Sequence, residues 1–133
     1  MKRRVLRFSV RSDAVMPLDQ MRTRLETAIG CTFQEGHFHK VPALVTELLG
    51  MTISLFEWRG LAGVRTFRLQ GRTADARFLE APGGQVAELE GIDIGQAVID
   101  LLAVRGAGDW RIPSREEIEA ELDHGDAIEQ RFR

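Results

Sequence analysis

Hydrophobic positions near the start of the chain recur at every second residue. From Leu6 to Arg11, apolar side chains alternate with charged or hydroxyl-bearing ones. Successive side chains of an extended chain point to opposite faces, so a period of two predicts a half-buried strand over residues 4–11. Its apolar face would carry Leu6, Phe8 and Val10, and its polar face Arg7, Ser9 and Arg11.

The hydrophobic spacing then lengthens to three and four residues, which predicts a helix over about 17–29. Pro17 suits the first helical turn, because its fixed φ fits and its missing N–H is not needed there. Gly30 is a natural end, because glycine readily adopts the left-handed conformation that follows a helix. The apolar positions are Leu18, Met21, Leu25, Ala28 and Ile29.

A second apolar cluster lies just before Gly50, and its spacing predicts another helix that begins near Pro42. Residues 31–35, between the two predicted helices, show no decisive pattern. The apolar stripe of this second helix would consist of Leu44, Val45, Leu48 and Leu49.

Two strands joined by a loop are predicted next. Residues 51–58 carry apolar side chains on both faces, as central strands covered on both sides do. After the glycine-containing loop 59–63, residues 64–70 place Phe67 and Leu69 among polar neighbours. The short loop predicts an antiparallel hairpin.

The C-terminal half contains signals for two capped helices. The carboxylate of Asp93 can accept the free amides of a helix over about 94–104. Ser114 and Glu117 match the Ser-x-x-Glu capping box and predict a helix over about 115–124. Residues 110–113 are expected to be extended, residues 77–79 could add a short edge strand, and residues 86–89 show no decisive pattern.

Together these segments predict an α+β fold, in which a small, mostly antiparallel sheet of 3–5 strands packs with 3–4 helices. A chain of 133 residues with 44% hydrophobic and 29% charged residues suits a single domain over residues 1–133. Its single cysteine excludes an intramolecular disulfide framework. No apolar run approaches the roughly 18 residues that span a bilayer, and no signal peptide is recognised, so we expect a cytoplasmic protein without a membrane partner.

Charge is distributed unevenly, although the net charge is only −2. Residues 1–80 contain 13 Lys and Arg against 8 Asp and Glu, whereas residues 81–133 contain 5 against 12. The acidic residues are densest in the predicted C-terminal helical segment, residues 114–133. This segment could be a solvated face, or it could be a docking surface for a basic partner.

Three candidate sites deserve a structural test. Glu35, His37 and His39 would point the same way on a strand, where they could hold a divalent metal or supply a general base; the alternative is a polar loop. Trp58 and Arg59 could anchor a partner, or the indole could close the core. Cys31 is expected to be an inert thiol.

Phosphate loops and direct nucleic-acid binding are not expected. No glycine motif matches a Walker or dinucleotide fingerprint. Basic residues do gather on the first strand and recur later, but few aromatic residues accompany them, which supports phosphate contact at most. These basic residues are Lys2, Arg3, Arg4, Arg7, Arg11, Arg65, Arg68, Arg72 and Arg77.

The order of these segments resembles the small immunity proteins of bacterial contact-dependent growth inhibition systems (CdiA/CdiI type). The likeness covers the general layout of most of the chain. It is carried by EGxFxKVPALVxELLGM at residues 35–51, Glu57-Trp58-Arg59-Gly60, Phe67-x-Leu69-x-Gly71, Ile92-Asp93-Ile94 and Trp110-Arg111-Ile112-Pro113-Ser114.

The resemblance implies a non-catalytic inhibitor that binds the C-terminal toxin domain of a large exoprotein, often a nuclease, and masks its active site. It implies no cofactor, metal or catalytic residue. We expect Ile118 and Leu122 to face the core. The expected partner-binding residues are Glu116, Glu119, Asp123, Asp126, Trp58 and Arg59.

Two alternatives remain open at this point. One is a small enzyme, metal-dependent or histidine-based, that uses Glu35, His37 and His39. The other is a scaffolding subunit, in which an exposed Trp58 or an unpaired edge strand would form a homodimer interface.

Overall fold

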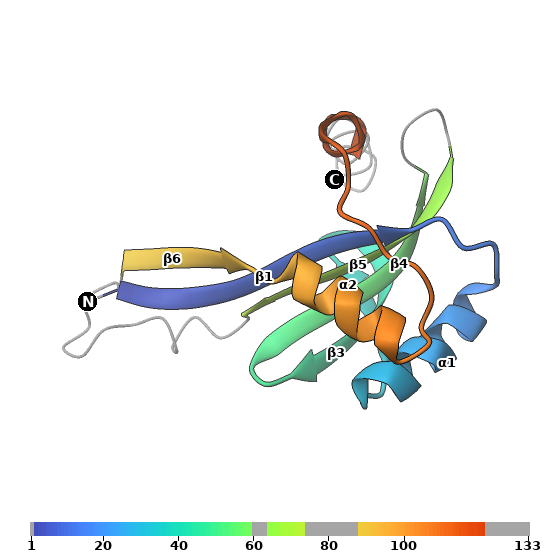
Figure 1. Cartoon of the computed structure of the whole chain (residues 1–133), viewed down its shortest axis with the longest axis horizontal. Helices are drawn as coiled ribbons and strands as arrows, with labels where there is room; N and C mark the ends of the chain where they lie inside the picture. The colour runs from blue at the N-terminus through green and yellow to red at the C-terminus, as the bar shows by residue number, and fades with distance from the viewer. Residues whose placement is uncertain (1, 60–63, 74–87, 122–133) are drawn as a thin grey trace.

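A six-stranded mixed sheet organises the part of the chain described by this computed structural model, residues 2–59, 64–73 and 88–121 (Figure 1). The fold is α+β, as the sequence predicts. A helical segment at residues 115–121 follows the labelled elements. These are β1 (Lys2–Ser12), α1 (Leu18–Ile29), β2 (Gln34–Phe38), β3 (Val41–Leu48), β4 (Met51–Arg59), β5 (Arg65–Thr73), β6 (Glu88–Asp93) and α2 (Gly95–Val104).

The strand order is β2-β3-β4-β5-β1-β6. Strands β2 to β5 form an antiparallel meander, and β5 then pairs antiparallel with β1. Only the last pairing, between β1 and β6, is parallel. Helix α1 therefore carries the chain from β1, inside the sheet, to β2 at the opposite edge.

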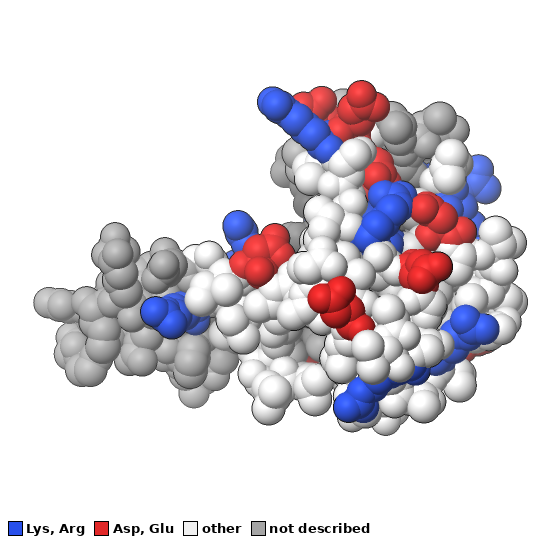
Figure 2. Space-filling model, viewed as in Figure 1, with Lys and Arg blue, Asp and Glu red and all other residues white. Residues whose placement is uncertain are grey.

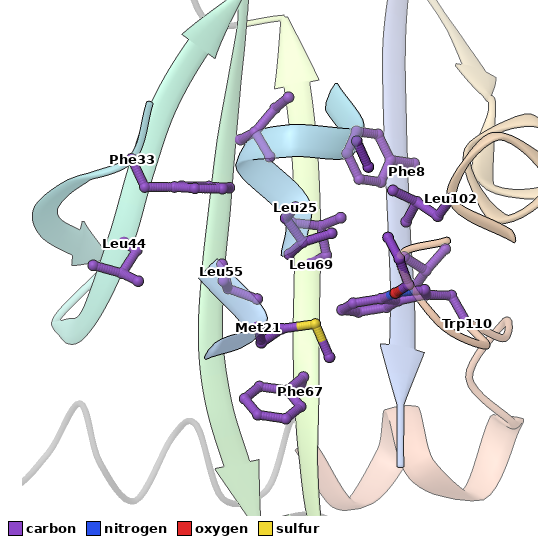
Figure 3. Close-up of a cluster of buried hydrophobic side chains, with 14 of the residues drawn as sticks. Phe8, Met21, Leu25, Phe33, Leu44, Leu55, Phe67, Leu69, Leu102 and Trp110 are labelled. Carbon is purple, nitrogen blue, oxygen red and sulfur yellow. The ribbon is translucent and has the colours of Figure 1, made fainter. Parts of the chain in front are cut away.

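The main core lies between one face of the sheet and the two helices. Figure 3 shows Leu25 of α1 and Leu102 of α2 over this face, where Leu55 and Leu69 lie on neighbouring strands. Trp110 closes one side, and its indole Nε1 donates a 3.0 Å hydrogen bond to the carbonyl of Ala107.

Gly71 lets an aromatic ring of the core approach the backbone of β5. A Cβ atom at this position would lie 2.3 Å from Cε1 of Phe8, which is far inside van der Waals contact. Phe8 and Gly71 are directly opposite each other across β1 and β5. The ring thus occupies the space that a side chain at residue 71 would need.

Several elements agree with the periodicity of the sequence. Strand β1 turns Phe8 and Val10 into the core, helix α1 ends at Gly30 with φ 78°, and β4 and β5 form the expected hairpin. Asp93 accepts a 2.8 Å hydrogen bond from the amide of Gly95 at the start of α2.

The helix predicted from Pro42 to Gly50 is wrong, because this segment forms strand β3. Leu49 (φ 52°) and Gly50 (φ 75°) form a two-residue turn between β3 and β4, and hairpins favour two positive φ values at these positions. The apolar stripe is compatible with either structure, and pairing with β2 and β4 decides for the strand. Strands β2 and β6 were not predicted, and residues 77–79 lie outside the described residues.

The segment after α2 returns to the sheet and then leaves it as a helix. Arg111 forms a bridge with Arg11, and the two amide-to-carbonyl distances are both 2.8 Å. The predicted capping box is present: the amide of Ser114 donates to Glu117 Oε1 (3.1 Å), and the amide of Glu117 donates to Ser114 Oγ (3.2 Å). Over the described residues, no helix is long and apolar enough to cross a membrane.

Candidate functional site

The face of the sheet opposite the two helices carries a ladder of cross-strand pairs between β1 and β5. Because side chains alternate along a strand, Arg7, Ser9 and Arg11 point to the face opposite the core residues Phe8 and Val10. Four of the six side chains in this ladder are arginines, and we call this side of the sheet the arginine face. The directly opposed pairs are Arg7 with Arg72, Ser9 with Gln70, and Arg11 with Arg68.

The inner pair, Arg11 and Arg68, is buried and shares one carboxylate from the helical segment. Arg11 Nε donates to Glu121 Oε1 at 2.8 Å, and Arg11 Nη2 donates to Oε2 at 2.6 Å. Arg68 Nη2 lies 3.8 Å from the same Oε2. Only 2% of Arg11 and 6% of Glu121 is exposed. This bidentate pair fixes residues 115–121 against the sheet.

Arg68 lies within a group of aromatic rings. Its guanidinium carbon is 4.9 Å from the ring centroids of both Phe56 and Trp58, and 5.8 Å from that of Phe38. Burial, and next the neighbouring charge of Arg11, lower the pKa of Arg68 to about 10, while Glu121 opposes this shift. The side chain therefore remains cationic at neutral pH and can interact with the rings.

Trp58 does not present a surface anchor. It is only 6% exposed and packs edge-on against Phe56 in a small cluster on the arginine face, next to Arg68. There the indole packs beside the guanidinium of Arg68. Arg59, the next residue, is exposed at the end of β4.

A second arginine of the C-terminal region ties the start of the helical segment to the end of β1. Arg111 Nε and Nη2 donate to the carboxylate of Asp13 at 2.9 and 3.0 Å, and Nη1 and Nη2 donate to that of Glu117 at 2.5 and 2.9 Å. The hydrogen bonds from Arg111 hold the pKa of Glu117 at about 2 and also lower that of Asp13. The same bonds raise the pKa of Arg111.

Acidic residues of the helical segment are thus divided between two sides. Glu117 and Glu121 face inward to arginines, while Glu116 and Glu119 are exposed on the outside. Figure 2 shows charged side chains of both signs gathered on this segment at the top of the view, where Glu119 Oε1 lies 3.4 Å from Arg115 Nε.

The expectation that Ile118 faces the core is wrong, because the side chain is 43% exposed. The inward side of the helix is taken by two carboxylates that arginines hold in place. Ile112, just before the helix, is 50% exposed and adds a second aliphatic group to the outer surface. Leu122, Asp123 and Asp126 lie outside the described residues.

The outer pair of the ladder, Arg7 and Arg72, borders an open cavity of about 770 Å³ that we call the outer groove. Both arginines are exposed. The opposite rim comes from the turn between β2 and β3. The groove is lined by Val5, Arg7, Phe8, His37, Phe38, His39, Thr52, Ser54, Gln70, Gly71, Arg72, Thr73 and Gly91.

Glu35, His37 and His39 are not brought together as a ligand set. The two histidines line the outer groove, but Glu35 does not. His39 has a φ of 54°, which ends the extended run that would have aligned the three side chains. Within residues 2–59, 64–73 and 88–121, no three His, Cys, Asp or Glu side chains form a group that could hold a metal ion.

Burial, with a smaller effect of Glu26, raises the pKa of the Cys31 thiol, which disfavours the nucleophilic thiolate.

The arginine ladder was missed by sequence reasoning, although its four arginines were noted among the basic residues. The alternation of Arg7, Ser9 and Arg11 predicts a polar strand face, but the register with β5 was needed to pair Arg7 with Arg72.

Comparison of the chain with protein-family models, with curated proteins and with solved structures gave no match.

Proposed function

We propose that this chain is a non-catalytic immunity protein, which binds a cognate toxin domain and masks its active site or substrate surface. The observation that supports this proposal is the anchoring of residues 115–121 by two arginines. Arg11 binds Glu121 and Arg111 binds Glu117, so the opposite side of the helix is held outward.

The outward surface has the chemical mixture that protein interfaces use. Ile112 and Ile118 supply exposed aliphatic area, and Glu116 and Glu119 supply negative charge beside it. Interfaces commonly combine an apolar centre with a polar rim. A helix that is already fixed to its own sheet loses less conformational freedom on binding, which favours affinity.

A basic partner suits this surface. A nuclease that grips a phosphate backbone needs basic side chains, and a rigid acidic helix can compete for them. Opposite charges also accelerate the encounter between two proteins and select against wrong partners. We therefore propose a nuclease domain as the target, and Glu116 and Glu119 as its described acidic contacts.

The test uses the C-terminal domain of the protein encoded directly upstream of this chain. That domain is expressed in bacteria with and without the chain, and growth is followed. If the proposal is correct, the domain arrests growth alone and does not do so in the presence of the chain. A domain that is toxic and equally toxic with the chain would contradict the proposal for this pair, as would the absence of binding between the purified proteins.

The placement of the interface is tested with a charge-reversed double variant, Glu116→Lys with Glu119→Lys. Association with the toxin domain should slow by about tenfold or more and lose most of its dependence on salt. The matched control is Glu35→Lys with Glu47→Lys, which makes the same change in net charge at exposed positions of β2 and β3. Equal association rates for the two double variants would exclude the helical surface as the interface.

A further inference from the structure

Arg7 and Arg72 form a like-charge pair on the surface of the sheet. They lie directly opposite each other across β1 and β5 and point to the arginine face. Like charges in this position destabilise a sheet, because their side chains are close neighbours. Such a pair is tolerable when an anion can lie between the two guanidinium groups.

In the inner pair of the same ladder, which is buried, a carboxylate of the protein itself compensates the repulsion between the two arginines. Arg11 and Arg68 are also directly opposed, and Glu121 supplies the carboxylate that both approach. For the outer pair, no ion pair of Arg7 or Arg72 with a carboxylate is found among the side chains that the structure describes.

Asp93 is the carboxylate that the register brings nearest to Arg7, but it is engaged elsewhere. The two residues are opposite each other across β1 and β6. Asp93 Oδ1 instead accepts a 2.8 Å hydrogen bond from the amide of Gly95 at the start of α2. The guanidinium of Arg7 lies over Gly91, where its Cζ is 3.6 Å from the position that a Cβ would take. It therefore remains at the edge of the outer groove.

The rest of the outer groove combines apolar atoms with several hydrogen-bonding groups, and the cavity is large enough for more than a simple ion. Thr52 and Ser54 of β4 contribute hydroxyl groups, and His37 and His39 contribute imidazoles from the opposite rim. Gln70 also lines the groove, and its buried Oε1 has no hydrogen-bond partner among the described residues. A cavity of about 770 Å³ is within the range that holds drug-sized molecules.

We infer that the outer groove binds a phosphomonoester of nucleotide size, with its phosphate between Arg7 and Arg72. A phosphate group carries a charge of about −1.5 to −2 at neutral pH and has three acceptor oxygens. It can neutralise two guanidinium groups and accept hydrogen bonds from both, whereas a single carboxylate has one charge and two oxygens. The remainder of the ligand then lies against the hydroxyl, amide and imidazole groups of the groove.

This inference concerns a site separate from the helical surface proposed to bind the toxin, and its test needs no toxin. Purified full-length chain is titrated with AMP, inorganic phosphate, adenosine and succinate, and binding is followed by amide chemical shifts in NMR spectra. AMP should shift amides of β1, β5 and the turn between β2 and β3. Inorganic phosphate should shift the subset around Arg7 and Arg72, adenosine should bind much more weakly, and succinate should be a poor ligand.

Variants decide whether the two arginines hold the phosphate. Arg7→Gln and Arg72→Gln should each weaken AMP binding about tenfold, because each removes charge-assisted hydrogen bonds. The control is Arg24→Gln, which removes an exposed arginine from α1, on the other side of the sheet. Affinity for AMP should stay unchanged in the control.

Three results would overturn the inference. The first is the absence of localised shifts with both AMP and inorganic phosphate. The second is equal weakening by Arg24→Gln, which would indicate nonspecific attraction to positive charge. The third is binding of succinate as tight as that of AMP, which would assign the groove to carboxylates. None of these results would bear on neutralisation of a toxin by the helical surface.

Discussion

Arg11 and Glu121 are 110 positions apart in the chain and form a buried, bidentate ion pair, with N–O distances of 2.8 and 2.6 Å. The pair joins β1, on the arginine face of the sheet, to the helical segment at residues 115–121. A buried ion pair adds little net stability compared with apolar residues, but breaking it by removing one partner is costly. Its effect here is to specify where the helix lies.

We expect Glu121→Gln to destabilise the protein by about 3 kcal/mol, because it leaves Arg11 and Arg68 buried without a compensating charge. Urea unfolding followed by circular dichroism measures this. The control is Glu116→Gln, which replaces an exposed carboxylate on the same helical segment. This variant should change stability by less than about 0.5 kcal/mol. Similar stabilities for the two variants would mean that the buried pair does not hold the helix.

The two buried arginines should respond differently to replacement by methionine. Arg68→Met should change stability by less than about 1 kcal/mol, because Arg11 still neutralises Glu121 and the methionine can pack against Phe56 and Trp58. Arg11→Met should cost about 3 kcal/mol, because Glu121 loses both of its short hydrogen bonds. Unfolding in guanidinium chloride compares the two variants. Equal costs would contradict the assignment of Arg11 as the main partner.

The stability of the protein should fall in acid partly through Glu117. Hydrogen bonds from Arg111 hold its pKa at about 2, below the ordinary value of 4.5. Because the pKa in the folded protein is the lower one, the contribution to stability is complete above pH 4.5 and is lost as the pH falls toward 2. Asp13 shifts in the same direction for the same reason.

An NMR titration of the side-chain carboxyl carbons tests this prediction directly. The midpoint for Glu117 should lie near pH 2 in the natural chain. In the Arg111→Gln variant it should rise toward 4.5, because the main cause of the shift is removed. A midpoint that does not change in this variant would assign the low pKa to the capping box with Ser114 instead.

Gly71→Ala should destabilise the protein by about 2 kcal/mol, because its Cβ would lie 2.3 Å from the ring of Phe8 and 2.9 Å from Sδ of Met51. Gly91→Ala is a suitable control within another strand, since its Cβ would meet atoms of Arg7 only at ordinary contact distances. Thermal unfolding compares both variants. Adding Phe8→Leu to Gly71→Ala should recover part of the loss, and its failure to do so would exclude the ring as the cause.

Local interactions account for the elements that sequence reasoning predicted. The alternation in β1, the spacing and glycine stop of α1, the carboxylate of Asp93 and the capping box of Ser114 and Glu117 all act within a few residues. Such interactions depend on short-range geometry alone, so they can be recognised in the amino-acid order. The α+β fold class and the hairpin of β4 and β5 follow from the same signals.

Tertiary structure decided the features in which distant segments meet. Leu44 and Leu48 have a spacing that fits a helix as well as a strand, and only pairing with β2 and β4 made the segment a strand. The acidic residues at 117 and 121 could have faced solvent, but arginines from other parts of the chain turned them inward. The pairing of Arg7 with Arg72 likewise depends on the register of two strands more than sixty residues apart. Charge and hydrophobicity are properties of single residues, whereas the partner of each charge depends on how the whole chain folds.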